Sequence, residues 1–236
     1  MSDVIVPGAV SAPGLRAHLA VPAGAGPWPG VVVLHEAFGL TDDVRAQADH
    51  LAAQGYLAVA PDLFTRGGVR CLRATFAASL SGEGAAFGDI EATRLWLAAR
   101  PDCTGRTGVI GFCLGGGFAL VAAARGFDVA AANYGRLPRG APDLLRGACP
   151  VVASYGGRDA TLRGTAARLD GLLTDLGVEH DVKEYPDAGH SFLNRETGVL
   201  AGVMRVTGIG GYHEPSAADA WTRILGYLDR HLRAAA

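Results

Sequence analysis

The feature that most constrains the fold is a regular alternation of short apolar runs with longer helix-like stretches. Two runs, residues 31–34 (VVVL) and 109–112 (VIGF), contain no polar residue, which is typical of central strands in a parallel sheet covered on both faces. The expected strands are residues 16–21, 30–35, 57–60, 107–112, 129–134, 150–155 and 180–185. The expected helices are residues 42–54, 85–99, 114–125, 161–176 and 216–232. This order predicts an α/β fold, with a mostly parallel central sheet flanked by helices on both faces.

Length and composition narrow the class of protein. A chain of 236 residues fits one large α/β domain, residues 1–236, better than two. Its 49% hydrophobic and 19% charged residues exclude a disordered chain, and its net charge of −2 excludes an obviously basic nucleic-acid binder. The sequence has no run of about 18 apolar residues that would suggest a membrane span. We therefore expect a soluble globular protein whose partners include neither nucleic acid nor a membrane.

Four cysteines, Cys71, Cys103, Cys113 and Cys149, are scattered along the chain without a C-x-x-C pair. This pattern fits neither a disulfide framework nor a thiolate zinc site, so we expect no metal and no other cofactor. The first residues lack the basic segment and the long apolar stretch of a secretory signal. We expect a cytoplasmic protein that is a monomer or a small homo-oligomer.

Two stretches lack a clear period and are expected to be irregular, residues 64–84 and 194–215. Loops of this length are uncommon inside a compact domain. Each is interpreted either as a substrate-facing loop or as a solvated connector.

The sharpest motif lies between an expected strand and an expected helix, and it reads Gly111-Phe112-Cys113-Leu114-Gly115. It has the form of the nucleophile elbow of α/β hydrolases, G-x-nucleophile-x-G, with cysteine in place of serine. The two glycines lack a Cβ, which lets the strained turn close. The helix that follows offers unpaired N–H groups and a positive dipole end, which favour a thiolate and a developing oxyanion. The motif therefore predicts a nucleophilic cysteine.

Two other interpretations of this segment exist. Cysteine is among the most buried residue types, so Cys113 could be an inert core thiol. Residues 115–117 are all glycine and could cradle a phosphate, but neither G-x-G-x-x-G nor G-x-x-x-x-G-K-[ST] is satisfied and no lysine follows. The strand-turn-helix context favours the nucleophile.

A thiol nucleophile needs a base, and the base needs an acid that orients it. α/β hydrolases carry these groups in the chain order nucleophile, acid, histidine, and Asp159 and His190 follow Cys113 in that order. Both come directly after expected strands, at the edge where active sites of open α/β sheets form. Each residue alone would more often be a turn or capping residue. Together they predict a triad of Cys113, Asp159 and His190.

His35 and Glu36 follow another expected strand. They begin the zinc-protease pattern H-E-x-x-H, but position 39 is glycine and the segment is a strand end, so a zinc site is not expected. In α/β hydrolases the loop after this strand donates an N–H to the oxyanion hole. We assign that N–H to Ala37, beside the N–H of Leu114, and expect Glu36 to point near the thiol.

Six segments together suggest a family: His35-Glu36, Pro61-Asp62-Leu63-Phe64, Gly111-Phe112-Cys113-Leu114-Gly115-Gly116, Gly156-Gly157-Arg158-Asp159, Gly189-His190-Ser191-Phe192 and Ala220-Trp221. With these the chain resembles, over essentially its whole length, the dienelactone hydrolases, cysteine-dependent α/β hydrolases that open enol-lactones in bacterial degradation of aromatic compounds. The resemblance implies that Cys113 is the nucleophile, His190 its base and Asp159 the orienting acid. It also implies that Glu36 contacts the thiol in the resting enzyme and is released when substrate binds. A carboxylate beside a thiol keeps it protonated and protects it from oxidation.

The family also binds a substrate carboxylate through arginines, and the resemblance places the first of them at Arg66. The second position, four residues after His190, holds Asn194, and Arg195 follows. A neutral amide binds a carboxylate more weakly than a guanidinium does. Arg66 and Arg195 could instead be solvated surface arginines. Tyr134, at a strand end, is expected either to form a pocket wall or to pack within the sheet.

The expected function is hydrolysis of an enol-lactone or activated carboxylic ester through a thioester intermediate. The substrate would be a small molecule that can carry a negative charge. One alternative is a general carboxylesterase or thioesterase acting on uncharged esters. Others are a catalytically silent α/β-hydrolase domain that binds a ligand, and a redox protein using Cys113, for which no resolving cysteine lies nearby in sequence.

Overall fold

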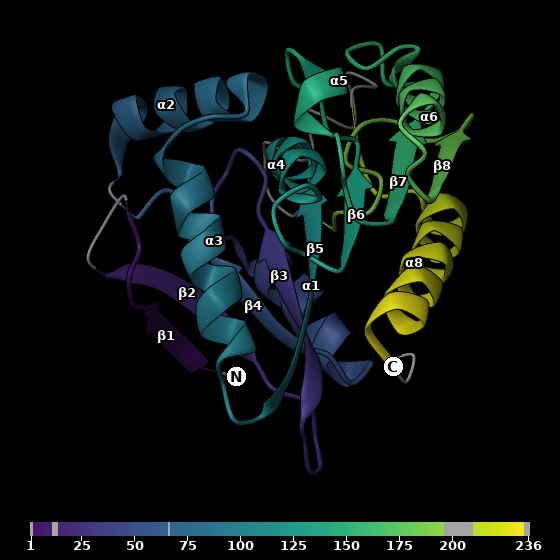
Figure 1. Ribbon diagram of the computed structural model, residues 1–236. Helices are drawn as coiled ribbons and strands as arrows, with labels where there is room; N and C mark the ends of the chain where they lie inside the picture. Colours follow the sequence, from purple (N-terminus) through teal and green to yellow (C-terminus); the bar gives the residue numbers. More distant parts are fainter. Residues whose placement is uncertain (1, 11–13, 66, 196–209, 234–236) are drawn as a thin grey trace.

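The computed structural model describes residues 2–10, 14–65, 67–195 and 210–233, which form a twisted sheet between two layers of helices (Figure 1). The strands are β1 (Ser2–Val6), β2 (Leu15–Ala20), β3 (Trp28–Leu34), β4 (Leu57–Pro61), β5 (Cys103–Phe112), β6 (Val129–Asn133), β7 (Val151–Gly156) and β8 (His180–Tyr185). The helices are α1 (Asp42–Ala53), α2 (Gly68–Ser81), α3 (Ala85–Ala98), α4 (Leu114–Ala122), α5 (Ala141–Leu144), α6 (Thr165–Asp175) and α8 (Glu214–Leu228), and a π-helix, η1 (Asp229–Arg233), follows α8.

The strand order in the sheet is β1-β2-β4-β3-β5-β6-β7-β8. The strands from β3 to β8 run parallel, and β1 and β2 are antiparallel at one edge. The predicted α/β fold with a mostly parallel central sheet is therefore confirmed. Strand β1 was not predicted, because four of its five residues are at least partly exposed at the sheet edge and give no clear alternation.

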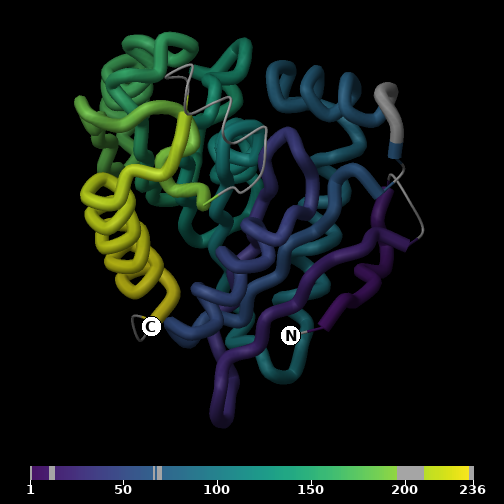
Figure 2. Tube along the Cα trace, turned by 180° about the vertical axis from the view of Figure 1, so that it is seen from behind, coloured from purple at the N-terminus to yellow at the C-terminus, as the bar shows by residue number. Residues whose placement is uncertain are grey.

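Helices cover both faces of the sheet, as predicted. α3 and α4 lie in front of the sheet in Figure 1, whereas α1 and α8 lie on the other face, which Figure 2 shows from behind. α1 and α8 meet where the His50 and Trp221 rings pack with centroids 4.6 Å apart. Among the described helices, none is long and apolar enough to cross a membrane.

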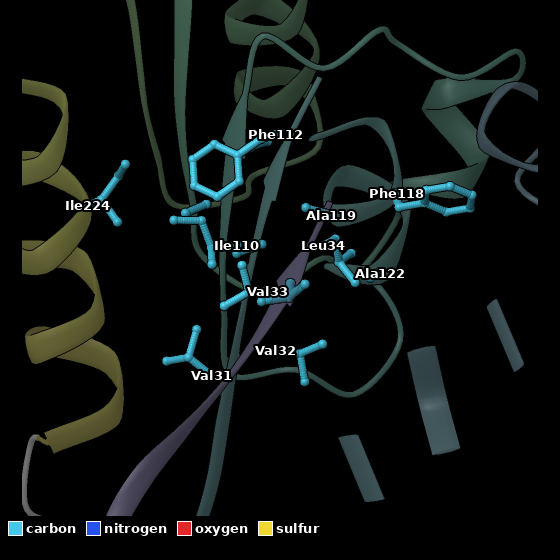
Figure 3. Close-up of a cluster of buried hydrophobic side chains, with 14 of the residues drawn as sticks. Val31, Val32, Val33, Leu34, Ile110, Phe112, Phe118, Ala119, Ala122 and Ile224 are labelled. Atoms are coloured by element: carbon cyan, nitrogen blue, oxygen red, sulfur yellow. The ribbon is translucent and has the colours of Figure 1, made fainter. Parts of the chain in front are cut away.

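The core lies on both sides of the central strands (Figure 3). Val31 and Ile110 point toward α8, the side on which Ile224 lies, whereas Val32 and Leu34 point toward α4. All of these side chains are fully shielded from solvent. The apolar character of the runs at 31–34 and 109–112 is thus explained, because every side chain of a strand covered on both faces is buried.

The expectation that residues 64–84 are irregular is wrong, since α2 occupies Gly68–Ser81. The buried face of α2 includes the small or polar side chains Thr75, Ala78 and Ser79, so the usual apolar period is weak. Small residues are suited to this place because α2 contacts α4 where α4 is rich in glycine. Gly82, with φ of 75°, ends the helix and is the signal that sequence reasoning passed over.

The remaining differences are at element ends. α6 begins at Thr165 instead of 161 because residues 159–164 form turns that end at Gly164, with φ of 72°. α4 ends three residues earlier than expected, and α8 begins two residues earlier. The four-residue helix α5 is too short to show a period. Most of the expected irregular stretch 194–215, residues 196–209, lies outside the described residues.

Candidate active site

Cys113 forms the sharp turn between β5 and α4. Its backbone angles are φ 53° and ψ −110°, a conformation that costs energy for any residue with a Cβ. A Cβ on Gly111 would lie 2.0 Å from the Gly115 carbonyl oxygen, and one on Gly115 would lie 2.1 Å from the Leu34 carbonyl oxygen. Both positions require glycine, as predicted, because a side chain there would open the turn that presents the Cys113 thiol.

The glycines that follow are also positions of close packing. A Cβ on Gly116 would lie 2.5 Å from the Asn133 carbonyl oxygen, and one on Gly117 would lie 2.6 Å from Ser79 Oγ. These glycines are buried. Because these residues have no side chain, the N-terminus of α4 packs directly against β6 and α2, and no space remains there for a phosphate. The packing agrees with the rejection of a phosphate-binding loop.

Asp159 and His190 are brought together by the turns after β7 and β8. His190 Nδ1 lies 2.5 Å from Asp159 Oδ2, and the Asp159 side chain is only 1% exposed. The other oxygen, Oδ1, accepts hydrogen bonds from Thr161 N–H at 2.9 Å and from Thr161 Oγ1 at 2.6 Å. Burial alone would raise the pKa of Asp159, but the hydrogen bonds from His190 and Thr161 outweigh it and hold this pKa below its usual value.

His190 interacts with the Cys113 thiol as well as with Asp159. Burial alone would lower the pKa of His190, but its hydrogen bonds with Asp159 and Cys113, and the charges of both groups, raise the pKa to about 10. The imidazole therefore interacts with both the thiol and the carboxylate. An imidazole in this position can take a proton from the thiol and remain charged at neutral pH.

Backbone strain is concentrated at this site. Within the described residues, the non-glycine positions with positive φ are Cys113 at 53°, Tyr134 at 42° and Ser191 at 57°. Ser191 follows His190 directly, and the Tyr134 ring centroid lies 5.2 Å from that of His190. Such strain persists only where the surrounding structure holds it in place, and it is most often found at functional sites.

Asn194 lies at the centre of a buried hydrogen-bond network. It is 2% exposed, its Nδ2 donates to Glu36 Oε1 at 3.2 Å and to Asp43 Oδ2 at 2.7 Å, and its Oδ1 accepts from the Tyr134 hydroxyl. The amide therefore binds two carboxylates of the protein itself. Of the residues predicted to bind substrate, Asn194 and Tyr134 lie in this network beside His190.

The two predicted arginines are not part of this network. The Arg195 guanidinium is exposed, packs on the Tyr212 ring at 4.2 Å and donates to the Tyr212 hydroxyl at 2.6 Å. Its backbone N–H donates to Asp43 Oδ1 at 2.9 Å. Arg66 lies outside the described residues. No group of three His, Cys, Asp or Glu side chains in the described part of the chain could hold a metal ion.

His35 connects the loop after β3 to the loop after β4. The Leu63 N–H donates to Nε2 at 3.0 Å, so the proton of the neutral ring is on Nδ1, which donates to the Glu36 carbonyl oxygen at 2.6 Å. Burial lowers the pKa of His35 and favours this neutral form. Glu36 is buried and Ala37 half-buried in the same loop.

Sequence reasoning missed two residues of α1 that support the site. Asp43 accepts hydrogen bonds from Asn194 and Arg195, and Gln47 Nε2 donates to the Leu193 carbonyl oxygen at 3.2 Å. Both hold the segment that follows His190. In sequence, Asp43 looks like an ordinary acidic residue of a helix's first turn, and no local signal connects it to a segment about 150 residues away.

Comparisons with known proteins identify the family and the fold. The chain matches the model of the dienelactone hydrolase family over residues 15–232. It is 31% identical over 222 residues to a carboxymethylenebutenolidase of Rhodococcus opacus, with 86% of this chain and 81% of that protein covered. Its fold is similar to a dienelactone hydrolase-like promiscuous phosphotriesterase from metagenomic libraries (TM-score 0.77, 24% identity, 98% of both chains) and to a dienelactone hydrolase from Anabaena variabilis (TM-score 0.66, 22% identity, 98% of both chains).

Proposed function

The chain belongs to the dienelactone hydrolase family, and we propose that it hydrolyses an enol-lactone or activated carboxylic ester through Cys113, His190 and Asp159. One observation carries the proposal. The His190 imidazole is hydrogen-bonded to the buried Asp159 carboxylate and lies near enough to the Cys113 thiol for that group to raise the pKa of His190, and the thiol is presented by a strained turn that only glycines allow. This is the arrangement that a nucleophile, its base and an orienting acid require.

The first step is attack by sulfur on the ester carbonyl carbon. The raised pKa of His190, about 10, means that the ring holds a proton at neutral pH and stabilises a thiolate beside it. The carbon–sulfur bond forms, and the carbonyl π electrons move to oxygen. The tetrahedral intermediate collapses as His190 gives its proton to the leaving oxygen, and a thioester on Cys113 remains. An enolate leaving group makes this collapse easy.

Two backbone N–H groups would stabilise the oxyanion. Leu114 is the first residue of α4, so its N–H has no acceptor within the helix. The second donor is Ala37. Since a trans peptide is planar, its N–H points away from the Glu36 carbonyl, which the His35 Nδ1–H bond holds in place. His35 thereby orients the Ala37 N–H, and a preorganised donor of this kind is worth about 10²- to 10³-fold in rate.

In the second step, water attacks the thioester carbon. The neutral His190 takes one proton from the water, the acid is released, and the thiolate–imidazolium pair is restored. The Asp159 carboxylate keeps the imidazole in place through both steps. The tight 2.5 Å contact with a carboxylate that is itself held by Thr161 suits this role.

A second candidate function is hydrolysis of uncharged esters, and the Asn194 network favours it. The amide faces Glu36 and Asp43, and Arg195 is bound to Tyr212. Asn194 is neutral, and the exposed Arg195 guanidinium contacts Tyr212 instead of joining the network beside His190. The buried Glu36 would repel an anionic group placed beside it. The contact of Glu36 with the resting thiol is a separate point and stays a prediction from the family resemblance.

Steady-state kinetics on an enol-lactone, on neutral p-nitrophenyl esters and on a p-nitrophenyl ester carrying a carboxylate would test these proposals. We expect Cys113→Ala to abolish turnover of every substrate, with Cys71→Ala as the control, because Cys71 is half-buried and its thiol makes one hydrogen bond within the described residues, to the Leu63 carbonyl at 3.6 Å. Full activity of Cys113→Ala would contradict the mechanism. Lack of turnover of any activated ester by the native protein would favour a silent binding domain.

Alkylation by iodoacetamide adds an independent readout. Burial raises the pKa of Cys149 to about 12 and also raises the pKa of Cys103, so these thiols should react slowly. We expect modification to map to Cys113 first and to proceed in step with loss of activity. Preferential modification of another cysteine with loss of activity would move the nucleophile away from Cys113.

A further inference from the structure

A second concave surface lies apart from the triad, between the loop after β6 and helix α6. Its volume is about 780 Å³, and it is lined by residues 136–142, 161–163 and several positions of α6. We call it the arginine groove, after Arg136, Arg139, Arg163 and Arg168, which line it. Figure 1 shows α5 and α6, which flank it, at the same end of the sheet.

The four arginines of the groove have no acidic partner within the described part of the chain. Within the described residues, none of their guanidinium groups makes a hydrogen bond or an ion pair, and Asp175 is the one carboxylate among the lining residues. Most other described arginines pair with a carboxylate, as Arg223 does with Asp181 at 2.8 Å. The groove thus gathers a net charge of about +3 on a chain whose overall charge is −2, and it attracts anions strongly.

The lining also contains apolar side chains, and these indicate the kind of anion. Leu162 and Pro138 are buried in its wall, and Leu137 and Leu172 are half-buried there. The volume lies within the range of about 300 to 1,000 Å³ that is usual for small-molecule sites. A bare inorganic ion would leave this apolar surface and most of the volume unused, whereas an organic anion would contact both.

We propose that the arginine groove binds an organic ligand that carries two or more phosphate groups, such as a nucleoside diphosphate. Guanidinium groups bind phosphate oxygens with paired hydrogen bonds. The negative charge of two phosphate groups is about equal in size to the net positive charge of the four arginines and one aspartate of the groove. The arginines gather in one concave patch on a chain of net negative charge. This favours a small polyanion over a nucleic acid, which needs an extended basic surface.

The groove adjoins the residues that support the triad. Thr161 lines it and also donates two hydrogen bonds to Asp159 Oδ1. The bound phosphates could therefore belong to the remote end of a substrate or to a separate ligand. The charge and shape of the groove favour the same ligand chemistry in both cases, whether or not the protein hydrolyses esters.

Isothermal titration calorimetry of the full chain with ADP at low ionic strength tests the proposal. We expect saturable binding that competes with pyrophosphate, is weakened by salt and is absent for adenosine. The double variant Arg139→Gln/Arg168→Gln should bind ADP at least tenfold more weakly. Arg73→Gln is the matched control, because Arg73 is an exposed arginine of α2 that lies outside the groove, and it should bind as the native protein does.

Failure of ADP to bind at millimolar concentration would overturn the proposal, as would equal affinity for the double variant and for Arg73→Gln. Because these readouts involve no turnover, they stand whether or not Cys113 is a nucleophile. Hydrolysis of acetyl-coenzyme A and of neutral N,S-diacetylcysteamine then distinguishes the two sources. A tenfold rise in KM for the phosphorylated thioester alone in the double variant assigns the groove to the substrate. ADP binding with unchanged KM for both thioesters assigns it to a separate ligand.

Discussion

Replacing Asp159 by asparagine tests the arrangement of the triad at its most constrained point. Asp159 accepts hydrogen bonds on both oxygens, from His190 on one and from the Thr161 N–H and hydroxyl on the other. An asparagine can present its oxygen to only one of these sides. Whichever way the amide turns, its NH₂ faces either the His190 Nδ1–H or the Thr161 N–H, so that two donors oppose each other.

The magnitude follows from this conflict. Loss of one hydrogen bond to a charged group costs about 1.5 to 3 kcal/mol, and a buried donor left without an acceptor costs about 1 to 3 kcal/mol. We expect a loss of about 3 to 5 kcal/mol in transition-state stabilisation, which corresponds to about 10²- to 10⁴-fold in kcat/KM. The pKa of His190 should also fall, because the Asp159 carboxylate is among the groups that raise it.

The assay is kcat/KM for an activated ester, with the fold of the variant checked by circular dichroism. Asp187→Asn is the control, because Asp187 lies in the same loop as His190 but is exposed and pairs with the exposed Arg158 at 2.8 Å. It should leave kcat/KM unchanged. A loss of less than tenfold for a folded Asp159→Asn protein would refute the role given to Asp159.

Three further predictions concern the turn, the oxyanion loop and the imidazole. Gly115→Ala should lower the free energy of unfolding in urea by more than about 3 kcal/mol, since its Cβ would overlap a backbone carbonyl. Gly171→Ala is the control, because no atom lies within 4 Å of an added Cβ at this position of α6, and it should be neutral or slightly stabilising. Equal effects of the two substitutions would contradict the close packing described at the Cys113 turn. His35→Phe should lower kcat by about 10²-fold with a smaller change in KM, and an unchanged kcat would contradict the positioning of Ala37. An NMR titration should show His190 losing its proton near pH 10 rather than 6.5. Because the pKa of His190 is higher in the folded state than in the unfolded state, the contribution of His190 to stability is fully present below pH 6.5 and is lost as the pH rises toward 10. A titration midpoint below pH 7 would contradict the thiolate–imidazolium pair.

The sequence predicted those parts of the site that rest on local patterns. Gly111, Cys113 and Gly115 form a motif whose spacing is required by one tight turn. Asp159 and His190 could be proposed because each lies in the turn that follows a strand of a parallel sheet, and the ends of such strands meet at one edge. Chain order and strand ends were sufficient to bring these three functional groups together.

The residues that sequence reasoning did not place depend on contacts between distant segments. Asp43 on α1 binds Asn194, and neither residue has a neighbour in sequence that suggests the pairing. Helix α2 was missed because it packs against α4 through small side chains, such as Ser79 against Gly117. In both cases the determining interaction is tertiary, so hydrophobic periodicity carries little of it.

The central claim is that Cys113 carries the acyl group during turnover, and trapping of that intermediate tests it most directly. The protein is mixed with a p-nitrophenyl ester, quenched with acid within the first turnovers, digested and mapped by mass spectrometry. We predict that the acyl group is found on the peptide containing Cys113 and that Cys113→Ala shows neither acylation nor turnover. Acylation of a different residue, or turnover by Cys113→Ala at the native rate, would contradict the mechanism.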